Sequence, residues 1–132
     1  MPNDFDANVK LMYATDVNTF SSIDDVKLND PFDVILDVEI GRDLNQGVNR
    51  HDARVAIRNL TQSTIVATVN ETQPLVPSNN SDFQDRWRIN IAAGWGPRAQ
   101  AGDVLQAIAS YKVTAGANVD FSTAESRTFV VS

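Results

Sequence analysis

The stretch Phe32-Asp33-Val34-Ile35-Leu36-Asp37-Val38-Glu39-Ile40 decides the fold class of this chain. Apolar residues occupy every second position, and mostly polar residues occupy the positions between them. Successive side chains of a β-strand point to opposite faces, so this period of two predicts a strand with one buried face. Pro31 precedes the stretch and Gly41 follows it, which fits the two ends of a strand.

Further segments carry strand patterns of the same kind. They span residues 9–13, 53–60, 63–69, 86–93, 103–113 and 127–131. Residues 15–28 are compatible with one more short strand followed by a loop. No segment shows a repeat of about 3.6 residues with capping residues at both ends, so no helix is predicted. The pattern therefore predicts seven or eight strands.

Strands with one apolar face must bury that face against another layer. Two antiparallel sheets packed face to face do this, so we expect an all-β, two-sheet β-sandwich, immunoglobulin-like or jelly-roll, as one domain over residues 1–132. A closed barrel is the alternative. The resulting core would contain Val34, Leu36, Val38, Val55, Ile57, Ile65, Trp87, Ile89, Ile91, Leu105, Ala107, Tyr111 and Phe129.

Acidic residues are concentrated in the first third of the chain. Residues 1–45 carry ten acidic and three basic side chains, whereas the rest carries seven acidic and eight basic ones, and the net charge is −6. This charge argues against nucleic acid as the partner. If strand 32–40 pairs with strand 86–93, outward acids meet outward arginines across the two strands. The residues concerned are Asp33, Asp37, Glu39, Arg86 and Arg88.

The composition excludes several kinds of reactive centre. The chain has no Cys, which excludes disulfides, iron–sulfur clusters, zinc fingers and thiol catalysis. Its one histidine, His51, excludes metal sites that need two imidazoles, and its polar surroundings predict a solvated loop histidine. There is no Gly-x-Ser-x-Gly motif, and the acids lie on outward strand faces or in polar loops. We therefore expect no enzyme and no resident cofactor.

Neither a membrane span nor a secretory signal is predicted. No stretch approaches the roughly 20 consecutive apolar residues of a transmembrane helix. The first residues, Met1–Asp6, lack the basic and apolar regions of a signal peptide. These observations favour either a cytoplasmic protein or one exported by a non-classical route.

Apolar residues on nominally polar strand faces give the first functional hypothesis. These residues are Ile35, Val66, Val104 and Ile108. Apolar side chains that meet on a surface form a patch that another protein can cover, and an unpaired edge strand can accept another chain. The first hypothesis is therefore a non-enzymatic module for protein–protein association, or a structural or accessory subunit, including one that associates with itself.

The alternative hypothesis is a carbohydrate-binding, lectin-like module, assisted by calcium. Trp95 lies between two glycines that would either expose its ring for stacking on a sugar or let it fold under the sheet. Asn79 and Asn80 lie in a polar loop and would contact the same ligand. Asp24, Asp25 and Asp30 are the candidate calcium ligands, although clustered aspartates are also typical of solvated turns.

Overall fold

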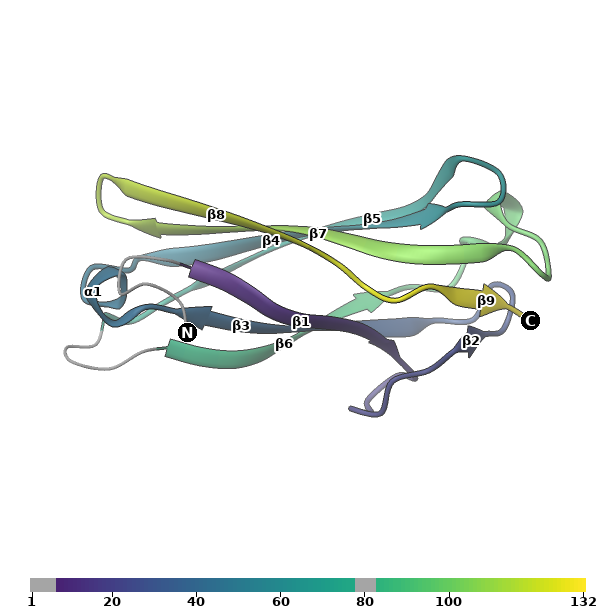
Figure 1. The fold of residues 1–132 in the computed structure, drawn as a ribbon, viewed down its shortest axis with the longest axis horizontal. Coiled ribbons are helices and arrows are strands. Elements are labelled where there is room, and N and C mark those ends of the chain that lie inside the picture. Colours follow the sequence, from purple (N-terminus) through teal and green to yellow (C-terminus); the bar gives the residue numbers. More distant parts are fainter. Residues whose placement is uncertain (1–6, 78–82) are drawn as a thin grey trace.

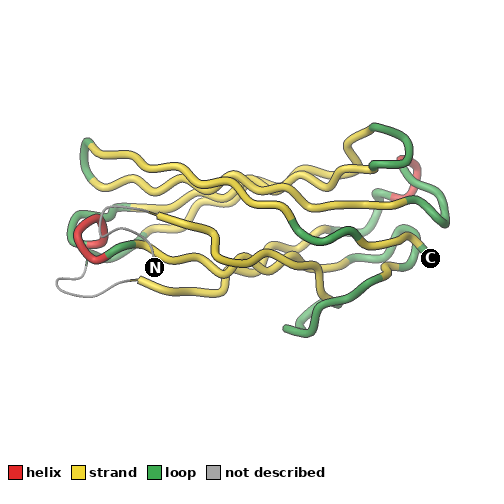
Figure 2. The backbone as a smooth tube through the Cα atoms, in the orientation of Figure 1, coloured by secondary structure: helices red, strands yellow, loops and turns green. Residues whose placement is uncertain are grey.

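Strands make up most of this protein, as Figures 1 and 2 show. The computed structural model describes residues 7–77 and 83–132. The strands are β1 (Ala7–Thr15), β2 (Asp25–Val26), β3 (Phe32–Ile40), β4 (Arg50–Asn59), β5 (Thr64–Pro74), β6 (Phe83–Ile91), β7 (Val104–Ala115), β8 (Asn118–Glu125) and β9 (Phe129–Val131). Two single helical turns, α1 (Arg42–Asn45) and η1 (Gly96–Arg98), lie between strands. The predicted all-β class is confirmed.

The strands form two sheets packed face to face (Figure 1). The small sheet has the order β1-β3-β6, and all its pairings are antiparallel. The large sheet has the order β2-β9-β7-β4-β5, and β8 also pairs with β7. The pairing of β2 with β9 is parallel, so the large sheet is mixed. The expected two-sheet sandwich is confirmed, with the addition of β8, which the strand pattern did not predict.

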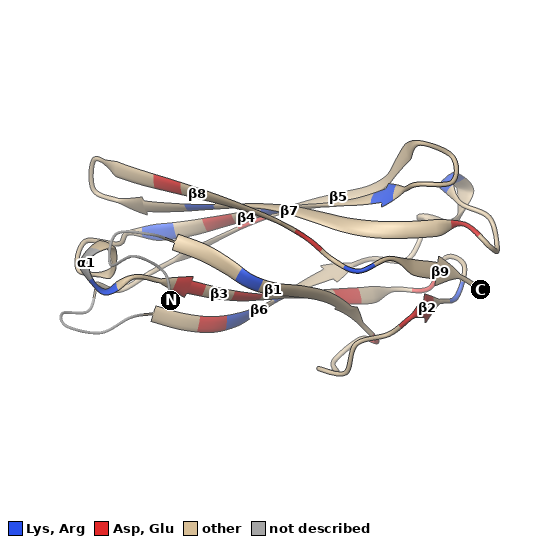
Figure 3. Ribbon diagram, in the orientation of Figure 1, with Lys and Arg blue, Asp and Glu red and all other residues tan. Residues whose placement is uncertain are grey.

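Strand β3 has the bounds that the alternation predicted, and it pairs with β6 as expected. The Nη1 atom of Arg88 lies 2.7 Å from Oδ2 of Asp33, so the expected pairing of charges across these strands is present. Glu39 instead pairs with Lys10 of β1, at 3.1 Å. Acidic positions on β3 therefore lie beside basic positions on both neighbouring strands (Figure 3). Two of the ten acidic side chains of residues 1–45 are therefore paired within this sheet.

The core lies between the two sheets. All of the expected core residues are buried except Ile65. Three aromatic rings fill the end of the sandwich near β9. The Phe32 ring lies 5.9 Å from that of Trp95 and 5.6 Å from that of Phe129, both in edge-to-face geometry. Such aromatic pairs contribute packing energy beyond the apolar area that they bury.

A β-bulge reverses the expected faces of Ile65 and Val66. In the pairing of β4 with β5, Ile57 lies opposite Ala67 and Arg58 lies opposite Ile65, so Val66 is an extra residue. Val66 is only 2% exposed, whereas Ile65 is 46% exposed. The predictions of Val66 as a surface contact and of Ile65 as core are therefore wrong. An alternating pattern cannot reveal an inserted residue, because each residue after the insertion changes face.

Ile35 is also buried, although it lies on the outer face of the small sheet. Its cross-strand neighbours are Tyr13 and Arg88. The segment between β1 and β2 folds back over this face, because the Asn18 amide donates a hydrogen bond of 3.0 Å to Asp33. The Phe20 ring lies 4.5 Å from the guanidinium carbon of Arg88. Ile35 has no exposed area, so the prediction that it contacts a partner is wrong.

Asp103 holds the turn after β4 against the start of β7. Its Oδ2 atom accepts hydrogen bonds from Asn59 Nδ2 at 2.8 Å, Gln62 Nε2 at 2.7 Å and the Gln100 amide at 2.9 Å. The bond from Asn59 contributes most to lowering the pKa of Asp103, followed by that from the Gln100 amide. Burial opposes this effect but does not cancel it. The turn is therefore fixed by an ionised carboxylate.

Candidate functional site: an open side of the sandwich

The sandwich is closed on the side where β1 meets β8. The Ala7 amide donates a hydrogen bond of 2.7 Å to Oδ2 of Asp120. The Val9 amide donates a longer bond of 3.3 Å to Oγ of Ser122. These side chains satisfy backbone groups of β1 that another strand would otherwise pair with. The edge of β1 is therefore covered by the protein itself.

The opposite side, formed by β5 and β6, is open. Within residues 7–77 and 83–132, β5 pairs only with β4, and β6 pairs only with β3. The edge of β6 carries Asp85, Arg86 and Arg88, and such charges protect an edge strand against pairing. The edge of β5 is eleven residues long and has Glu71 as its one ionisable residue. Strand β5 is therefore the less protected of the two edges.

Alternation along β5 shows which backbone groups face the open edge. The Leu75 amide donates to the carbonyl of Asn49 at 2.8 Å, which continues the register of β5 with β4. Hydrogen-bonded pairs alternate along an antiparallel ladder, so every second residue turns its N–H and C=O away from the partner strand. On β5 those residues are Thr68, Asn70 and Thr72, whose side chains are exposed. Their backbone groups are thus placed for pairing with another strand.

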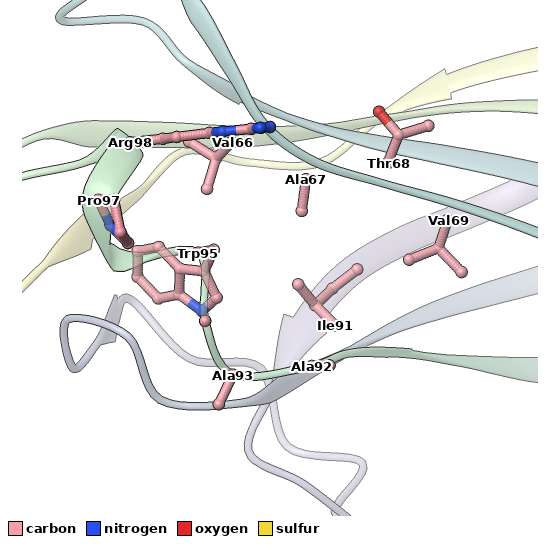
Figure 4. Close-up of a pocket in the computed structure, with 11 residues that line it drawn as sticks. Val66, Ala67, Thr68, Val69, Ile91, Ala92, Ala93, Trp95, Pro97 and Arg98 are labelled. Carbon is pink, nitrogen blue, oxygen red and sulfur yellow. The ribbon is translucent and has the colours of Figure 1, made fainter.

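An apolar trough of about 510 Å³ lies between β5 and the end of β6. Its walls include Val66, Ala67 and Val69 of β5, with Ile91 and Trp95 across from them (Figure 4). The inward face of β5 is therefore only partly covered by the small sheet. An added strand beside β5 would extend over this trough.

Trp95 forms part of the wall of the trough. Its side chain is 4% exposed, and its Nε1 atom donates a hydrogen bond of 2.8 Å to the carbonyl of Asp30. Asn29 Oδ1 fixes the surrounding loop, because it accepts from the amides of Gly94 at 2.9 Å and Gly96 at 2.7 Å. The ring is not exposed for stacking on a sugar, because it folds under the sheet and packs on Phe32, and ligand binding by Trp95 stays a prediction.

A buried polar cluster lies farther along the same side, centred on His51. His51 belongs to β4 and has no exposed area, so the prediction of a solvated loop histidine is wrong. Its Nδ1 atom lies 2.7 Å from the Tyr111 hydroxyl, and its Nε2 atom lies 3.1 Å from Oε1 of Gln73. Its ring stacks on that of Trp87 from the small sheet, at 4.1 Å between centroids. His51 thus links both sheets.

Burial dominates the proton equilibria of this cluster. It lowers the pKa of His51 below its ordinary value, and the Gln73 hydrogen bond and the carboxylates of Asp85 and Asp52 offset only part of this effect. Burial also raises the pKa of Tyr111, and the charge of Asp85 raises it further. At neutral pH the imidazole is therefore uncharged and the phenol keeps its proton. A neutral imidazole with one donor and one acceptor satisfies both of its partners.

The remaining predicted contact residues are Val104, Ile108, Asn79 and Asn80. Val104 and Ile108 lie half-buried on the outer face of the large sheet, and Val104 lies opposite Val130, which is 41% exposed. These three apolar residues stay candidates for a contact patch. Asn79 and Asn80 lie outside the described residues.

The predicted calcium ligands are not assembled into one site. Asp24, Asp25 and Asp30 are all exposed, and Lys27 lines the same hollow as two of them. In the part of the chain that the structure describes, no three His, Asp or Glu side chains lie close enough together to hold a metal ion. The calcium prediction on these carboxylates therefore lacks the geometry it required. No helix formed by the described residues is long and apolar enough to cross a membrane.

The sequence interpretation missed a row of side chains on the outer face of the large sheet. Thr72, Asp52, Lys112 and Phe121 lie side by side on β5, β4, β7 and β8. The Phe121 ring is 67% exposed, and the ammonium group of Lys112 lies 6.0 Å from its centroid. The row borders a shallow hollow of about 210 Å³. Strand β8 could have been predicted from alternation, because the exposed residues Val119, Phe121 and Thr123 are separated by more buried ones.

Comparisons with known proteins assign neither a family nor a function to this chain. No family model and no curated protein matches the chain. Among solved structures, the fold resembles part of a β-glucuronidase from glycoside hydrolase family 2, with a TM-score of 0.48 and 13% sequence identity. The match covers 90% of this chain and 12% of that protein, so this chain spans a small part of its length. No functional residue is carried over from it.

Proposed function

We propose that this protein is a non-enzymatic β-sandwich module that associates with a second copy of itself through the edge of β5. The observation that carries the proposal is the combination of a long edge strand almost without charge and an apolar trough beside it. Natural edge strands are usually short, charged, bulged or covered, since an unprotected edge pairs with other chains. Between the bulge at Val66 and Pro74, the described part of the chain gives β5 none of these protections except Glu71.

Self-association suits β5 because its sequence tolerates pairing with itself. In an antiparallel pair related by a two-fold axis at Thr68, the two Thr68 residues lie opposite each other. Ala67 of one copy then lies opposite Val69 of the other, and both side chains face the trough side of the sheet. Such an arrangement would join two large sheets into one and cover apolar surface. Like charges meet nowhere near the axis.

Substitution at the proposed axis tests this arrangement. Thr68 is exposed, so Thr68→Lys should fold normally yet place two ammonium groups opposite each other in the dimer. Repulsion between charges about 5 Å apart near a protein surface costs about 1–3 kcal/mol, which weakens Kd by about fivefold to about 150-fold. Thr68→Glu should weaken association equally. A mixture of the two variants should form a heterodimer, because their charges are complementary.

Sedimentation velocity over a series of concentrations measures each of these states. Thr123→Lys is the matched control, because it adds the same charge at an exposed outer-face position on β8. It should leave association unchanged. A wild-type chain that stays monomeric at every concentration would refute self-association, and a dimer that Thr68→Lys does not weaken would exclude the β5 edge as its interface.

The second candidate function is carbohydrate binding at the outer-face row of Thr72, Asp52, Lys112 and Phe121. An exposed ring beside a row of hydrogen-bonding groups on a flat sheet is suited to the apolar and hydroxyl faces of a sugar. A glycan array with the wild type and Phe121→Ala tests it, with Val119→Ala as the control on the same strand. Binding that Phe121→Ala abolishes would support this function, and no binding by the wild type would remove it.

A further inference from the structure

His51 lies in a buried cluster at the open side of the sandwich. If its ring gains a charge, the strands on that side have to accommodate the charge. Tyr111 on β7 and Gln73 on β5 bond to its two nitrogens, while Trp87 and Phe83 of β6 pack against its ring. The chain contains no other histidine. Gln73 is half-buried and belongs to the open edge strand, so the group bonded to Nε2 of His51 is itself partly exposed to solvent.

We propose that His51 is an acid-sensitive latch, whose protonation releases the Gln73 end of β5 from the Phe83 end of β6. The latch is closed when the imidazole is neutral. Gln73 Oε1 can only accept, so Nε2 carries the hydrogen and Nδ1 accepts from the Tyr111 hydroxyl. Both polar atoms of the ring are then satisfied, and the uncharged ring stacks on Trp87 without cost.

Protonation of His51 disrupts this arrangement of one donor and one acceptor on the ring. The new proton on Nδ1 points at the Tyr111 oxygen, so the hydroxyl must turn its own hydrogen elsewhere. The resulting imidazolium is enclosed by Trp87, Phe83 and the β4 backbone, with no carboxylate of the described residues within ion-pair distance. Stacking on Trp87 favours the charged ring through a cation–π interaction. Burying a charge without an ionic partner costs more than this contact returns, so the charged ring favours conformations in which water reaches it. Trp87 Nε1 is buried without an acceptor among the described residues, and opening would satisfy it as well.

The charged neighbours do not replace the missing partner. Asp85 of β6 and Asp52 of β4 attract a proton on His51 through space only. Asp52 lies beside other groups, because its Oδ1 atom accepts a hydrogen bond from Thr72 and its Oδ2 atom, which has no hydrogen bond from the described residues, lies 3.7 Å from Nε of Arg50. Glu71, the remaining acid on this part of β5, precedes Gln73 by two residues and makes no ion pair within the described ranges. Tyr111 on β7 keeps its proton at every pH relevant here.

The direction of the pH effect follows from the lowered pKa of His51. In an opened chain the imidazole binds a proton near pH 6.5, whereas in the closed chain it does so only at lower pH. The closed state therefore loses stability relative to the open state as pH falls below about 6.5, and it is unaffected above that value. The aromatic cluster around Phe32 and Phe129 holds no titratable group, so that end of the sandwich should stay closed.

Nuclear magnetic resonance on the full chain tests the latch, since His51 gives the one imidazole signal. We expect a titration midpoint below 6.5, with the indole N–H signal of Trp87 moving along the same curve and that of Trp95 staying constant. Hydrogen-exchange protection of the Glu71 and Gln73 amides, which point towards β4, and of the β6 amides in residues 83–87 that point towards β3 should fall over the same pH range, while that of β9 should not. A midpoint at or above 6.5, or equal loss of protection at both ends, would overturn the proposal.

Two substitutions separate the latch from general acid sensitivity. His51→Gln removes the titrating group, so protection of the Glu71 and Gln73 amides should no longer depend on pH in this range. Gln73→Glu keeps the size of the side chain and places a carboxylate at Nε2, so the His51 midpoint should rise above that of the wild type and the acid-induced opening should disappear. If His51→Gln does not fold, the shift in Gln73→Glu still decides the matter, and an unchanged or lower midpoint there contradicts the latch.

Discussion

Replacing Asp33 with alanine should cost this protein about 3 kcal/mol of unfolding free energy. Asp33 accepts hydrogen bonds from Arg88 at 2.7 Å, Asn90 at 2.9 Å and the Asn18 amide at 3.0 Å. Each bond to a charged group contributes about 1.5–3 kcal/mol, so a simple sum would reach about 4.5–9 kcal/mol. The loss is smaller because all three donors reach water once the carboxylate is gone: the Arg88 side chain is 26% exposed, and Asn90 and Asn18 are exposed.

Urea denaturation followed by circular dichroism measures this loss, and Asp37→Ala is its matched control. Asp37 lies on the same face of β3 and is half-buried, but none of the described residues bonds to its carboxylate. Its removal should therefore change the free energy of unfolding by less than about 1 kcal/mol. If both substitutions cost the same, the Asp33 hydrogen bonds do not hold the segment between β1 and β2 in place.

The same site predicts how stability depends on pH. Burial alone would raise the pKa of Asp33, but the hydrogen bonds from Asn90, the Asn18 amide and Arg88, together with the charge of Arg88, outweigh it and hold the pKa below 3.8. The folded chain therefore binds this proton less readily than the unfolded chain. Its contribution is complete above about pH 5 and is lost as the pH falls through the folded pKa. In Asp33→Asn the acid limb of the stability curve should be shallower than in the wild type.

Four further substitutions test other parts of the fold by the same urea titration or by thermal melting. Phe129→Ala removes a ring that is 1% exposed and should cost about 3–5 kcal/mol. Gly96→Ala places a Cβ atom 2.8 Å from that of Asn29 and should cost about 1–3 kcal/mol, whereas Gly47→Ala meets its nearest atom at 3.9 Å and should be neutral. Asp103→Asn should lower Tm at neutral pH and flatten its decline in acid, because the ionised carboxylate holds the turn and its pKa is lowered.

The fold class and the centre of the small sheet were predictable because they depend on local alternation. The nine residues from Phe32 to Ile40 alternate except at Ile35, and both their strand and its pairing with the strand of Trp87 are confirmed. Charge helped as well, because Asp33 and Arg88 required partners on the same face. The hairpin of β7 and β8 was incomplete in the prediction, because Val119 and Phe121 face solvent and do not resemble a buried face.

The candidate site was less predictable because it depends on topology and on chain paths outside the strands. Val66 turned inward at a bulge, and Ile35 was covered by the segment that contains Phe20. His51 was assigned to a loop because polar residues surround it, yet its partners Gln73 and Tyr111 are distant in sequence. No pattern in β5 itself states that it is an edge strand. Whether a strand lies at the edge of a sheet depends on which strands pair with each other, and the alternation along one strand does not determine its partners.

The open side follows from the unequal size of the two sheets. In the described residues, six strands form one sheet and three form the other, so the small sheet cannot cover the whole inner face of the large one. On one side of the sandwich β1 contacts β8, and Asp120 of β8 accepts a hydrogen bond from the backbone of β1. On the other side the small sheet does not extend far enough to cover the inner face of β5. Two features lie along this side: an apolar trough beside Trp95, and the buried polar cluster of His51, Gln73 and Tyr111 farther along. Apolar surface favours a partner, whereas a polar cluster is sensitive to protons, and both properties arise from one mismatch in sheet width.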